Sequence, residues 1–521
     1  MKTTHFAFLS GLALSSMMLF GCGYDGMDSG YMPNYAMDAE IMAEMAELLE
    51  AGEELPMEQA AFTNTLNAPQ STFAADVDTA SYTLFRYRIH NDIDPRNTAN
   101  IYGVKAPYRT EELINYFKYD YPAPDADEVF SITTEYTDCP WNKDTKLLLI
   151  GTQTRKIEEI PPSNLVFLVD VSGSMNAKNK LDLLKRSLMK LLPSLTSADR
   201  LSIVTYADGE KVVLEGADPA KDSKKIEKAI KNLSSGGATN GERGLEMAYE
   251  VAQKFFIEGG NNRIIMGTDG DLNVGIRSTD DLKAYVENKR DHGIYLSIFG
   301  FGYDNYNDAL METIADNGNG SYHHIDCELE AERVLVEDRA STLFTVAKDV
   351  KYQVSFNPEM IKGYRLIGYE NRTMAAEDFA NDKKDGGEIG ANHQVTVLYE
   401  IAEKGSAAAI DDFDSSLSPQ MPEFNPGEMA KLSVRYKNPT GDSASIEKNY
   451  PLDLTVGELT PNIAFAAAVA EMGMILNESK YVGTSSQQSI KSLLAVPPSE
   501  FQDKYKLEFQ ELVAQSFKLM K

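Results

Sequence analysis

The middle of the chain alternates between two hydrophobic patterns. Short continuous apolar runs, such as Leu165–Val169 and Ile294–Gly300, are typical of strands buried on both faces of a sheet. Between them, apolar residues recur every three or four positions, as in the segment from Leu181 to the helix-stopping Pro193. This alternation predicts an α/β fold with a doubly wound, mostly parallel sheet over residues 161–346.

The pattern also places the individual elements of this sheet domain. Further strands are expected at Leu201–Tyr206, Arg263–Gly267 and Ser321–Ile325. Further helices are expected around Ile226–Leu233, Leu245–Phe255, Thr279–Lys289, Asn307–Asn317 and Glu328–Val346, the last of which closes the domain. Ligands of such folds bind beyond the carboxyl ends of the strands, where the strand order reverses.

The segments on either side of this domain have a different pattern. Residues 73–160 form a smaller N-terminal region with helical and extended pieces, and residues 347–521 form a β-rich C-terminal domain. Two terminal helices are expected at its end, one opened by Pro461 and reaching Leu476 and one at Phe501–Leu519. Because the sheet domain looks inserted between them, the two flanks could pack as one composite domain.

The N-terminus resembles a bacterial lipoprotein signal. Lys2 precedes an apolar run that ends in Leu19-Phe20-Gly21-Cys22, which predicts cleavage after residue 21 and a lipid on Cys22. The alternative is a plain secretory peptide with an incidental cysteine. Residues 22–72 are expected to form an acidic tether, since no Lys, Arg or His occurs from Gly23 to Phe85. A short amphipathic helix within Met37–Ala51 is the alternative for part of this tether.

Composition and charge narrow the classes of partner. The 521 residues include 50 Lys and Arg and 79 Asp and Glu, which gives a formal net charge of −29. Nucleic-acid binding relies on clustered basic residues, so we expect no nucleic acid as partner. Three cysteines are too few for a disulfide framework. Cys139 and Cys327 flank the sheet domain and could pair in an oxidising compartment, although free buried cysteines are also common.

Oxygen-bearing side chains gather where the predicted strands end. The strand Leu165–Val169 runs directly into Asp170, Ser172 and Ser174, which are spaced by two on a tight turn. A later glycine-rich loop presents Thr239, and the strand Arg263–Gly267 is followed by Asp269. Carboxylates and hydroxyls are hard oxygen ligands of the kind that Mg²⁺ prefers. The spacing therefore predicts a divalent-metal site at this edge of the sheet.

These five positions resemble the metal-ion-dependent adhesion site of von Willebrand factor type A (VWA) domains. The likeness extends along the chain to a bacterial group, the YfbK-like type A domain lipoproteins. It is carried by Ala75–Tyr82, Arg109–Phe117, Thr268–Gly275, Gly300–Gly302, Gly318–Gly320 and Tyr364–Arg372. The resemblance implies that the hydroxyls of Ser172, Ser174 and Thr239 bind the metal, and that Asp170 and Asp269 bind it directly or through water.

The resemblance also implies a function and leaves alternatives. It implies a membrane-anchored, extracytoplasmic binding protein without enzymatic activity, which holds Mg²⁺ (or Mn²⁺ or Ca²⁺) and binds a partner's Asp or Glu carboxylate. Gly23 after Cys22 favours the outer membrane if the source has one. The first alternative is a structural scaffold of an envelope complex in which the metal only stabilises loops. A metal-dependent hydrolase is the second, although Ser172 stands where a phosphatase of the haloacid-dehalogenase type needs a second carboxylate.

Overall fold

The computed structural model describes most of the chain beyond residue 59. The described residues are 60–75, 78–97, 107–157, 160–237, 243–270, 279–303, 308–382, 384, 386–439 and 444–521. All of them belong to one compact unit, Pro56–Lys521. The predicted signal peptide, Cys22 and most of the predicted tether lie outside the described residues. The predictions for that part of the chain therefore stay predictions.

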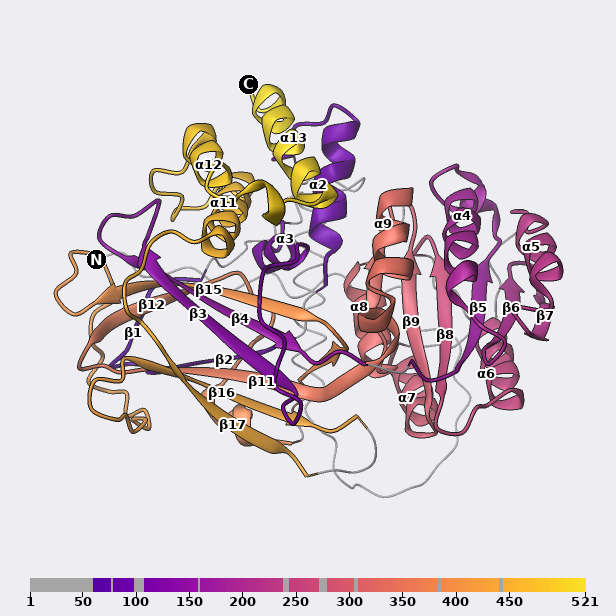
Figure 1. Ribbon diagram of the computed structural model, residues 1–521, viewed down its shortest axis with the longest axis horizontal. Helices are drawn as coiled ribbons and strands as arrows, with labels where there is room; N and C mark the ends of the chain where they lie inside the picture. Colours follow the sequence, from indigo (N-terminus) through magenta and orange to yellow (C-terminus); the bar gives the residue numbers. More distant parts are fainter. Residues whose placement is uncertain are drawn as a thin grey trace, which may run out of the picture. The chain divides into compact units, whose positions relative to one another are not determined.

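A six-stranded sheet occupies the middle of the chain (Figure 1). Its strand order is β10-β9-β8-β5-β6-β7, and each pairing is parallel except that of β6 with β7. The strands are β5 (Ser163–Asp170), β6 (Arg200–Tyr206), β7 (Glu210–Ala217), β8 (Asn261–Thr268), β9 (Ile294–Gly300) and β10 (Tyr322–His324). The predicted doubly wound, mostly parallel sheet is confirmed, and β7 adds an antiparallel edge strand that the sequence pattern did not indicate.

Helices cover both faces of this sheet because side chains of a strand alternate between the faces. Leu165, Phe167 and Val169 of β5 pack in one apolar cluster with α4 (Leu181–Leu191) and α5 (Ser223–Lys231). Val166 and Leu168 point the other way and pack with α6, α7 and α8. The bounds of these three helices are Gly244–Lys254, Thr279–Asp291 and Asp308–Asn317. A strand that is buried on both faces in this way explains the continuous apolar run of β5.

The single helix expected at Glu328–Val346 was wrong. The helix α9 ends at Glu332, a π-helical segment follows at Arg333–Glu337, and a short α10 ends at Leu343. The backbone N–H of Asp338 donates to the carbonyl of Arg333, which widens the turn. Val346 belongs to the next strand, β11 (Thr345–Phe356), where β-branched residues pack well on a pleated sheet.

The flanking segments form a five-stranded and a six-stranded sheet that share one apolar core. The first sheet has the order β1-β12-β15-β4-β3 and the second the order β13-β2-β11-β16-β17. Their remaining bounds are β1 (Thr63–Asn64), β2 (Gln70–Ala74), β3 (Phe130–Asp138), β4 (Lys146–Thr154), β12 (Ile361–Ile367), β13 (Thr373–Met374), β14 (Gly387–Gly390), β15 (Gln394–Glu403), β16 (Ala430–Lys437) and β17 (Ile446–Leu452), with β14 paired to β11. Because β2 pairs with β11 and β4 pairs with β15, chain from both sides of the sheet domain builds this sandwich. The two flanks therefore do pack together.

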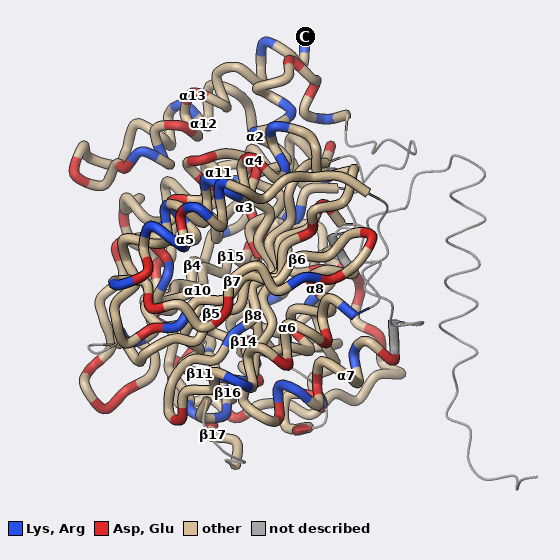
Figure 2. The backbone as a smooth tube through the Cα atoms, turned by 90° about the vertical axis from the view of Figure 1, so that its right-hand side faces the viewer, with Lys and Arg blue, Asp and Glu red and all other residues tan. Residues whose placement is uncertain are grey.

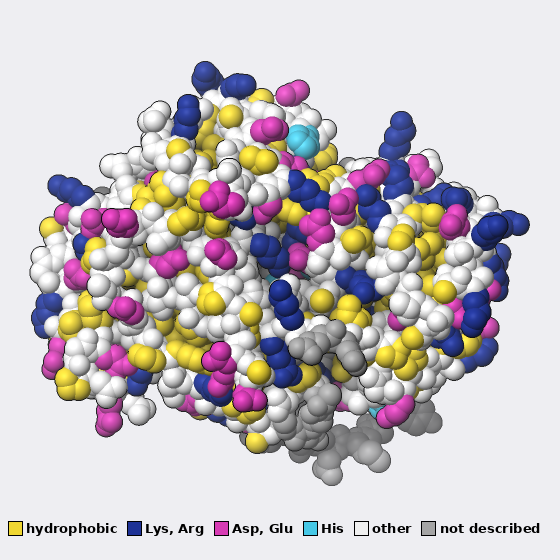
Figure 3. Space-filling view, in the orientation of Figure 1, with side chains coloured by type: hydrophobic (Ala, Val, Ile, Leu, Met, Phe, Trp, Pro, Cys, Tyr) yellow, Lys and Arg dark blue, Asp and Glu magenta, His cyan; other side chains and the backbone are white. Residues whose placement is uncertain are grey.

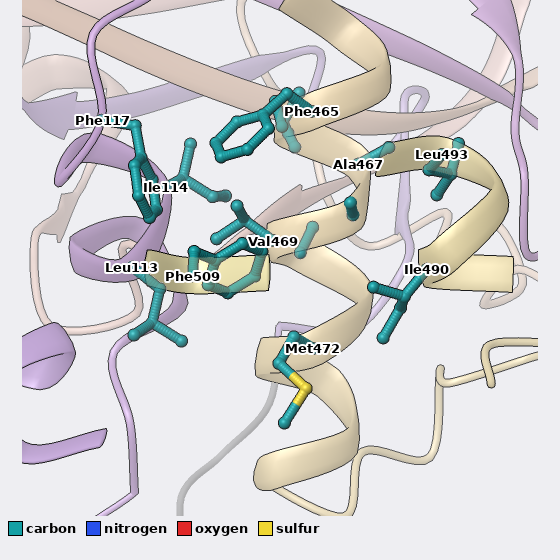
Figure 4. Packing of buried hydrophobic residues seen from close by; sticks show 14 of the residues in the cluster. Leu113, Ile114, Phe117, Phe465, Ala467, Val469, Met472, Ile490, Leu493 and Phe509 are labelled. Carbon is teal, nitrogen blue, oxygen red and sulfur yellow. The ribbon is translucent and has the colours of Figure 1, made fainter. Parts of the chain in front are cut away.

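Helices cover the outer face of the first of these sheets. Leu147, Leu149 and Leu398 turn away from the sandwich core and join a cluster with α2 (Ala80–His90) and α3 (Thr110–Asn115). The same cluster contains α11 (Pro461–Leu476), α12 (Gln487–Leu494) and α13 (Lys504–Leu519). In Figure 4, Phe117 just after α3, Phe465 of α11 and Phe509 of α13 lie close together. The α11 helix is apolar on all sides because it is the centre of this layer.

The ends of the terminal helices follow local capping. The α11 helix begins at Pro461, as predicted, with Thr460 as its N-cap residue. The last helix begins at Lys504 and not at the expected Phe501, because the Asp503 carboxylate accepts hydrogen bonds from the backbone N–H groups of Tyr505 and Lys506. The α12 helix, which starts with a capping box at Ser486, was not predicted. Its eight residues are too few for a clear periodic signal.

The two cysteines that could have paired do not form a disulfide. Cys139 and Cys327 are both free. Cys139 is buried in the cluster around α11, and burial raises the pKa of its thiol to about 12. Burial likewise raises the pKa of Cys327 to about 12. Cys139 is therefore a small core residue, in line with the alternative reading that free buried cysteines are common.

Charges of both signs are interspersed over the described part of the protein (Figure 2). On the face in Figure 3, hydrophobic side chains are scattered among charged and polar ones. Among the helices of the described ranges, none combines the length and the apolar character that a membrane crossing needs. Ten of the acidic residues lie in residues 23–59, ahead of the described part, where no basic residue offsets them. A good share of the net charge of −29 therefore belongs to the predicted tether.

Replacing Glu111 by Gln is expected to make stability less dependent on pH. Glu111 of α3 is fully buried, and burial together with the Glu112 carboxylate raises its pKa from 4.5 to about 7. The stability that depends on the neutral carboxyl group of Glu111 is fully present below pH 4.5, and it is lost as the pH rises through 7. In urea unfolding at pH 8 the variant should gain about 1–3 kcal/mol over the original chain, a gain that vanishes towards pH 4.5.

The half-buried Glu128 is the control for this measurement. It pairs with Lys448 at the surface, and Glu128→Gln should change stability by less than about 1 kcal/mol at either pH. A Glu111→Gln variant that is less stable than the original chain at pH 8 would contradict the expectation.

Candidate metal centre

The candidate site lies where the strand connections diverge. From β5 the chain moves first to β6 on one side, and it later returns to β8 on the other side of β5. Asp170 is the last residue of β5, and Asp269 comes directly after β8. Because both strands are parallel, these aspartates leave the same edge of the sheet. This is the position at which open α/β sheets bind ligands.

The turn after β5 is held together by its own hydrogen bonds. Oδ1 of Asp170 accepts from the backbone N–H of Ser172 at 2.8 Å, and Oδ2 accepts from the Tyr206 hydroxyl at 3.2 Å. The Oγ atoms of Ser172 and Ser174 lie 2.9 Å apart. Asp170 and Ser172 are fully buried, whereas Ser174 is exposed. The turn therefore places one carboxylate and two hydroxyls between the interior and the surface.

The glycine-rich loop after α5 returns to this turn. The N–H of Gly236 donates to the carbonyl of Val171 at 2.9 Å, and the N–H of Gly173 donates to the carbonyl of Gly237 at 3.0 Å. Gly237 has φ +87°, and a Cβ atom there would lie 2.2 Å from Oδ2 of Asp208. Only glycine fits that close approach. Thr239 is two residues further along the chain and lies outside the described residues, as do Asp271 and Asn273 of the loop after β8.

Asp269 completes the described part of the site. Its side chain is fully buried, and Oδ2 forms an ion pair with Nζ of Lys180 at 2.9 Å. Within the described residues, the buried Oδ1 has no hydrogen-bond partner. Thr268 places Oγ1 3.5 Å from Oδ2 of Asp170, so the end of β8 reaches the turn after β5. Asp170, Ser172, Ser174 and Asp269 therefore leave the same edge of the sheet, and their role as metal ligands stays a prediction.

The electrostatics of the site disfavour the ionised form of both carboxylates at once. Burial raises the pKa of Asp170 to about 6, and the nearby Asp269 carboxylate adds to this rise, while hydrogen bonds from Ser172 oppose it. An unpartnered buried oxygen on Asp269 adds to the cost. Two carboxylates and two hydroxyls are a donor set that fits a hard divalent cation. No cluster of three or more His, Cys, Asp or Glu suited to a metal occurs in the described residues. The candidate site differs from such clusters because two of its described donors are serine hydroxyls.

A serine-nucleophile mechanism finds no support in the described geometry. Such a mechanism needs a histidine base beside Ser172 or Ser174. His324 instead pairs through Nδ1 with Oγ1 of Thr83 and through Nε2 with the carbonyl of Gly302. His323 is on the neighbouring position of β10, and its burial lowers its pKa to about 4. Both described hydrogen bonds of His324 therefore go to groups other than Ser172 and Ser174.

Three comparisons with known proteins identify the relationship. The model of the von Willebrand factor type A domain matches residues 164–334, and a further model described as von Willebrand factor matches residues 53–149. The model described as "Uncharacterized protein YfbK, C-terminal" matches residues 341–519. The uncharacterized protein YfbK of Escherichia coli (strain K12) is 38% identical over 455 residues, which cover 85% of this chain and 77% of that protein. This chain belongs to the YfbK family.

More distant relatives share only part of this YfbK family member. The inter-alpha-trypsin inhibitor heavy chain H3 of Mesocricetus auratus is 27% identical over 274 residues, which are 49% of this chain and 30% of that protein. Among solved structures, a von Willebrand factor type A protein from Catenulispora acidiphila matches with TM-score 0.40 and 15% identity, covering 76% of this chain and 98% of that one. The ArnB paralog VWA2 from Sulfolobus acidocaldarius has TM-score 0.34, 17% identity and the same two coverages.

Sequence patterns found the acidic and hydroxyl groups of this YfbK family member but missed their neighbours. Tyr206 at the end of β6 and Thr268 at the end of β8 contact Asp170, and Lys180 before α4 contacts Asp269. Tyr206 and Thr268 could have been suspected, since they end strands at the same sheet edge. Lys180 carried no such signal, because a lysine at the start of a helix is usually solvated.

Proposed function

We propose that this YfbK family member is a membrane-anchored extracytoplasmic lipoprotein that binds a protein partner through a divalent-metal adhesion site in its type A domain. The observation that carries the proposal is the buried Asp170 carboxylate beside Asp269, whose Oδ1 lacks a partner within the described residues. A divalent cation offsets both carboxylates at once. The type A domain match covers the whole site.

Five side chains would hold the ion. They are Asp170, Ser172, Ser174, Thr239 and Asp269, of which all but Thr239 are described. The oxygen-only set suits Mg²⁺, and Mn²⁺ or Ca²⁺ fit the same chemistry. When bound, the ion supplies a positive charge that can accept a further oxygen ligand.

The ligand of this charge is an Asp or Glu carboxylate of the partner protein. Ser174 is exposed, so the site is open at the surface beside a buried carboxylate. A carboxylate ligand also explains how an acidic chain can bind an acidic surface, since the ion bridges two groups that repel each other without it.

The anchor is a separate part of the proposal. It consists of a lipid on Cys22, the first residue after the signal peptide, with residues 22–72 as an acidic tether. Acyl chains hold proteins at membranes through about 0.8 kcal/mol per buried CH₂ group. This places the type A domain in the cell envelope, on the extracytoplasmic side, and at the outer membrane if the source has one.

The test is affinity capture from solubilised membranes with the purified full chain as bait. In Mg²⁺ the bait should retain its partner, EDTA should release it, and added Mg²⁺ should restore capture. Ser174→Ala should weaken capture at least about tenfold, since it removes an exposed hydroxyl of the site. Ser197→Ala, an exposed serine before β6 at the opposite end of the sheet, is the matched control.

The outcome of the capture experiment distinguishes metal-dependent adhesion from the alternative of a structural scaffold. A partner that stays bound in EDTA and is equally retained by Ser174→Ala would mean that the contacts run elsewhere. The metal would then only stabilise loops, and the adhesion function would be refuted.

A further inference from the structure

A lysine is built into the candidate metal centre. Lys180 precedes α4, and only 3% of the residue is exposed. Its Nζ lies 2.9 Å from Oδ2 of Asp269. A buried ammonium is costly unless it is paired, so this position is held by specific contacts. None of the five expected ligands requires a lysine, and the pairing therefore calls for its own explanation.

Three elements fix the lysine in place. Its backbone N–H donates to the carbonyl of Ala177 at 3.0 Å, and its carbonyl accepts from the N–H of Leu184 at 2.9 Å, within α4. Its stem lies against Gly302 after β9, where a Cβ atom would come within 2.4 Å of Cε of Lys180. Gly302 has φ +78°, a conformation that glycine adopts without strain. The loop after β9 thus leaves a path for this side chain to the interior.

The lysine changes the charge of the site. Of the described expected ligands, Asp170 and Asp269 carry two negative charges, and the Lys180 ammonium offsets one of these two. The net charge of these three side chains is therefore −1, and a bound divalent cation would change it to +1. Without the lysine, the same cation would leave the site neutral. The ammonium therefore repels the metal, and it attracts an anion once the metal is bound.

We infer that Lys180 sets the ligand preference of the site, weakening the binding of the divalent cation and making the loaded site select a singly charged carboxylate over a neutral oxygen ligand. The inference rests on the proposed function, because it takes a metal at Asp170 and Asp269 as given. It assigns to the partner an ionised Asp, Glu or terminal carboxylate, and it excludes amides and hydroxyls as sufficient ligands.

The first measurement is Mg²⁺ titration by calorimetry on the full chain and on Lys180→Met, which keeps the length of the apolar stem and removes the charge. The variant should bind Mg²⁺ at least about tenfold more tightly, because the cation no longer faces the ammonium. Its melting temperature in EDTA should fall, and the rise on adding Mg²⁺ should be larger than in the original chain. Lys180→Gln serves as a second neutral variant if Lys180→Met folds poorly.

The second measurement uses propionate as the probe, with propionamide as its neutral counterpart, both in saturating Mg²⁺ and at equal ionic strength. The original chain should be stabilised against heat by propionate at least about fivefold more strongly than by propionamide. In Lys180→Met that preference should disappear. Lys185→Met is the control, since Lys185 lies on the same helix but donates to the carbonyl of Leu233. It should leave both measurements unchanged.

The results distinguish the two proposals. Absence of Mg²⁺ binding in the original chain and in both neutral variants would refute the metal site itself. Mg²⁺ binding by the original chain with equal or weaker binding by the neutral variants would overturn only the role of Lys180. A preference for propionate that survives Lys180→Met would overturn it as well.

Discussion

Asp170→Ala is expected to abolish Mg²⁺ binding. The carboxylate is buried at the end of β5, it organises the turn through the Ser172 N–H, and it is the group whose pKa burial raises to about 6. Loss of groups that only orient a ligand costs 10–100-fold in metal affinity, so loss of a direct ligand should cost more than about 100-fold. Calorimetry should show no Mg²⁺ heat, and the metal-dependent rise in melting temperature should be absent.

A comparison variant and a matched control make this result interpretable. Asp170→Asn preserves the shape of the side chain and should also lose the metal. In EDTA it should melt no lower than the original chain, because it removes a buried charge that faces Asp269. Asp182→Ala changes the charge equally at an exposed position of α4 and should bind Mg²⁺ normally. Unchanged Mg²⁺ binding by Asp170→Ala would mean that the ion binds elsewhere.

Arg86→Met is expected to destabilise the fold by about 3–5 kcal/mol, because it leaves buried carboxylates without their counter-charge. Arg86 of α2 is fully buried and pairs with Asp326 and Glu330, at 2.5 and 2.9 Å. It also pairs with Glu508 of α13 at 3.0 Å. Burial alone would raise the pKa of Glu330, but Arg333 and Arg86 outweigh it and lower that pKa to about 2. Urea unfolding at pH 7 measures the loss.

The arginine connects segments that are remote in the sequence, so its loss should act beyond one helix. Asp326 and Glu330 belong to the type A domain, whereas α2 and α13 belong to the helical layer on the sandwich. Arg186→Met removes an exposed pair with Glu328 and should cost less than about 1 kcal/mol. A similar small cost for Arg86→Met would show that the buried network contributes little.

Much of the sheet domain could be predicted because its signals are local. The β5 strand is buried on both faces by α-helices that come from the same stretch of chain, so its apolar run and the periodic helices on either side are readable without knowing the fold. The break in the helix after Glu328 was not readable. The π-helical segment starts at Arg333, whose guanidinium pairs with Glu330 and donates to Oγ1 of Thr79, a residue 254 positions earlier.

The candidate site divides in the same way. Asp170, Ser172 and Ser174 lie on one turn, and their spacing by two along the chain is enough to predict that they lie close together. Asp269 could be added because parallel strands end at one edge of the sheet. The ion pair between Lys180 and Asp269 spans 89 positions and depends on the space above Gly302, which only the packed loops create.

The sequence alone determined the α/β class, the parallel strands of the type A domain with the helices between them, and the carboxylates and hydroxyls offered at its edge. Hydrophobic period and strand ends fix these features, and both act over a few residues. Only the tertiary structure decided that β4 and β15, some 250 residues apart, share a sheet, and that a lysine balances an aspartate at the site. Such pairings depend on which buried surfaces and charges remain to be matched once the local elements have formed.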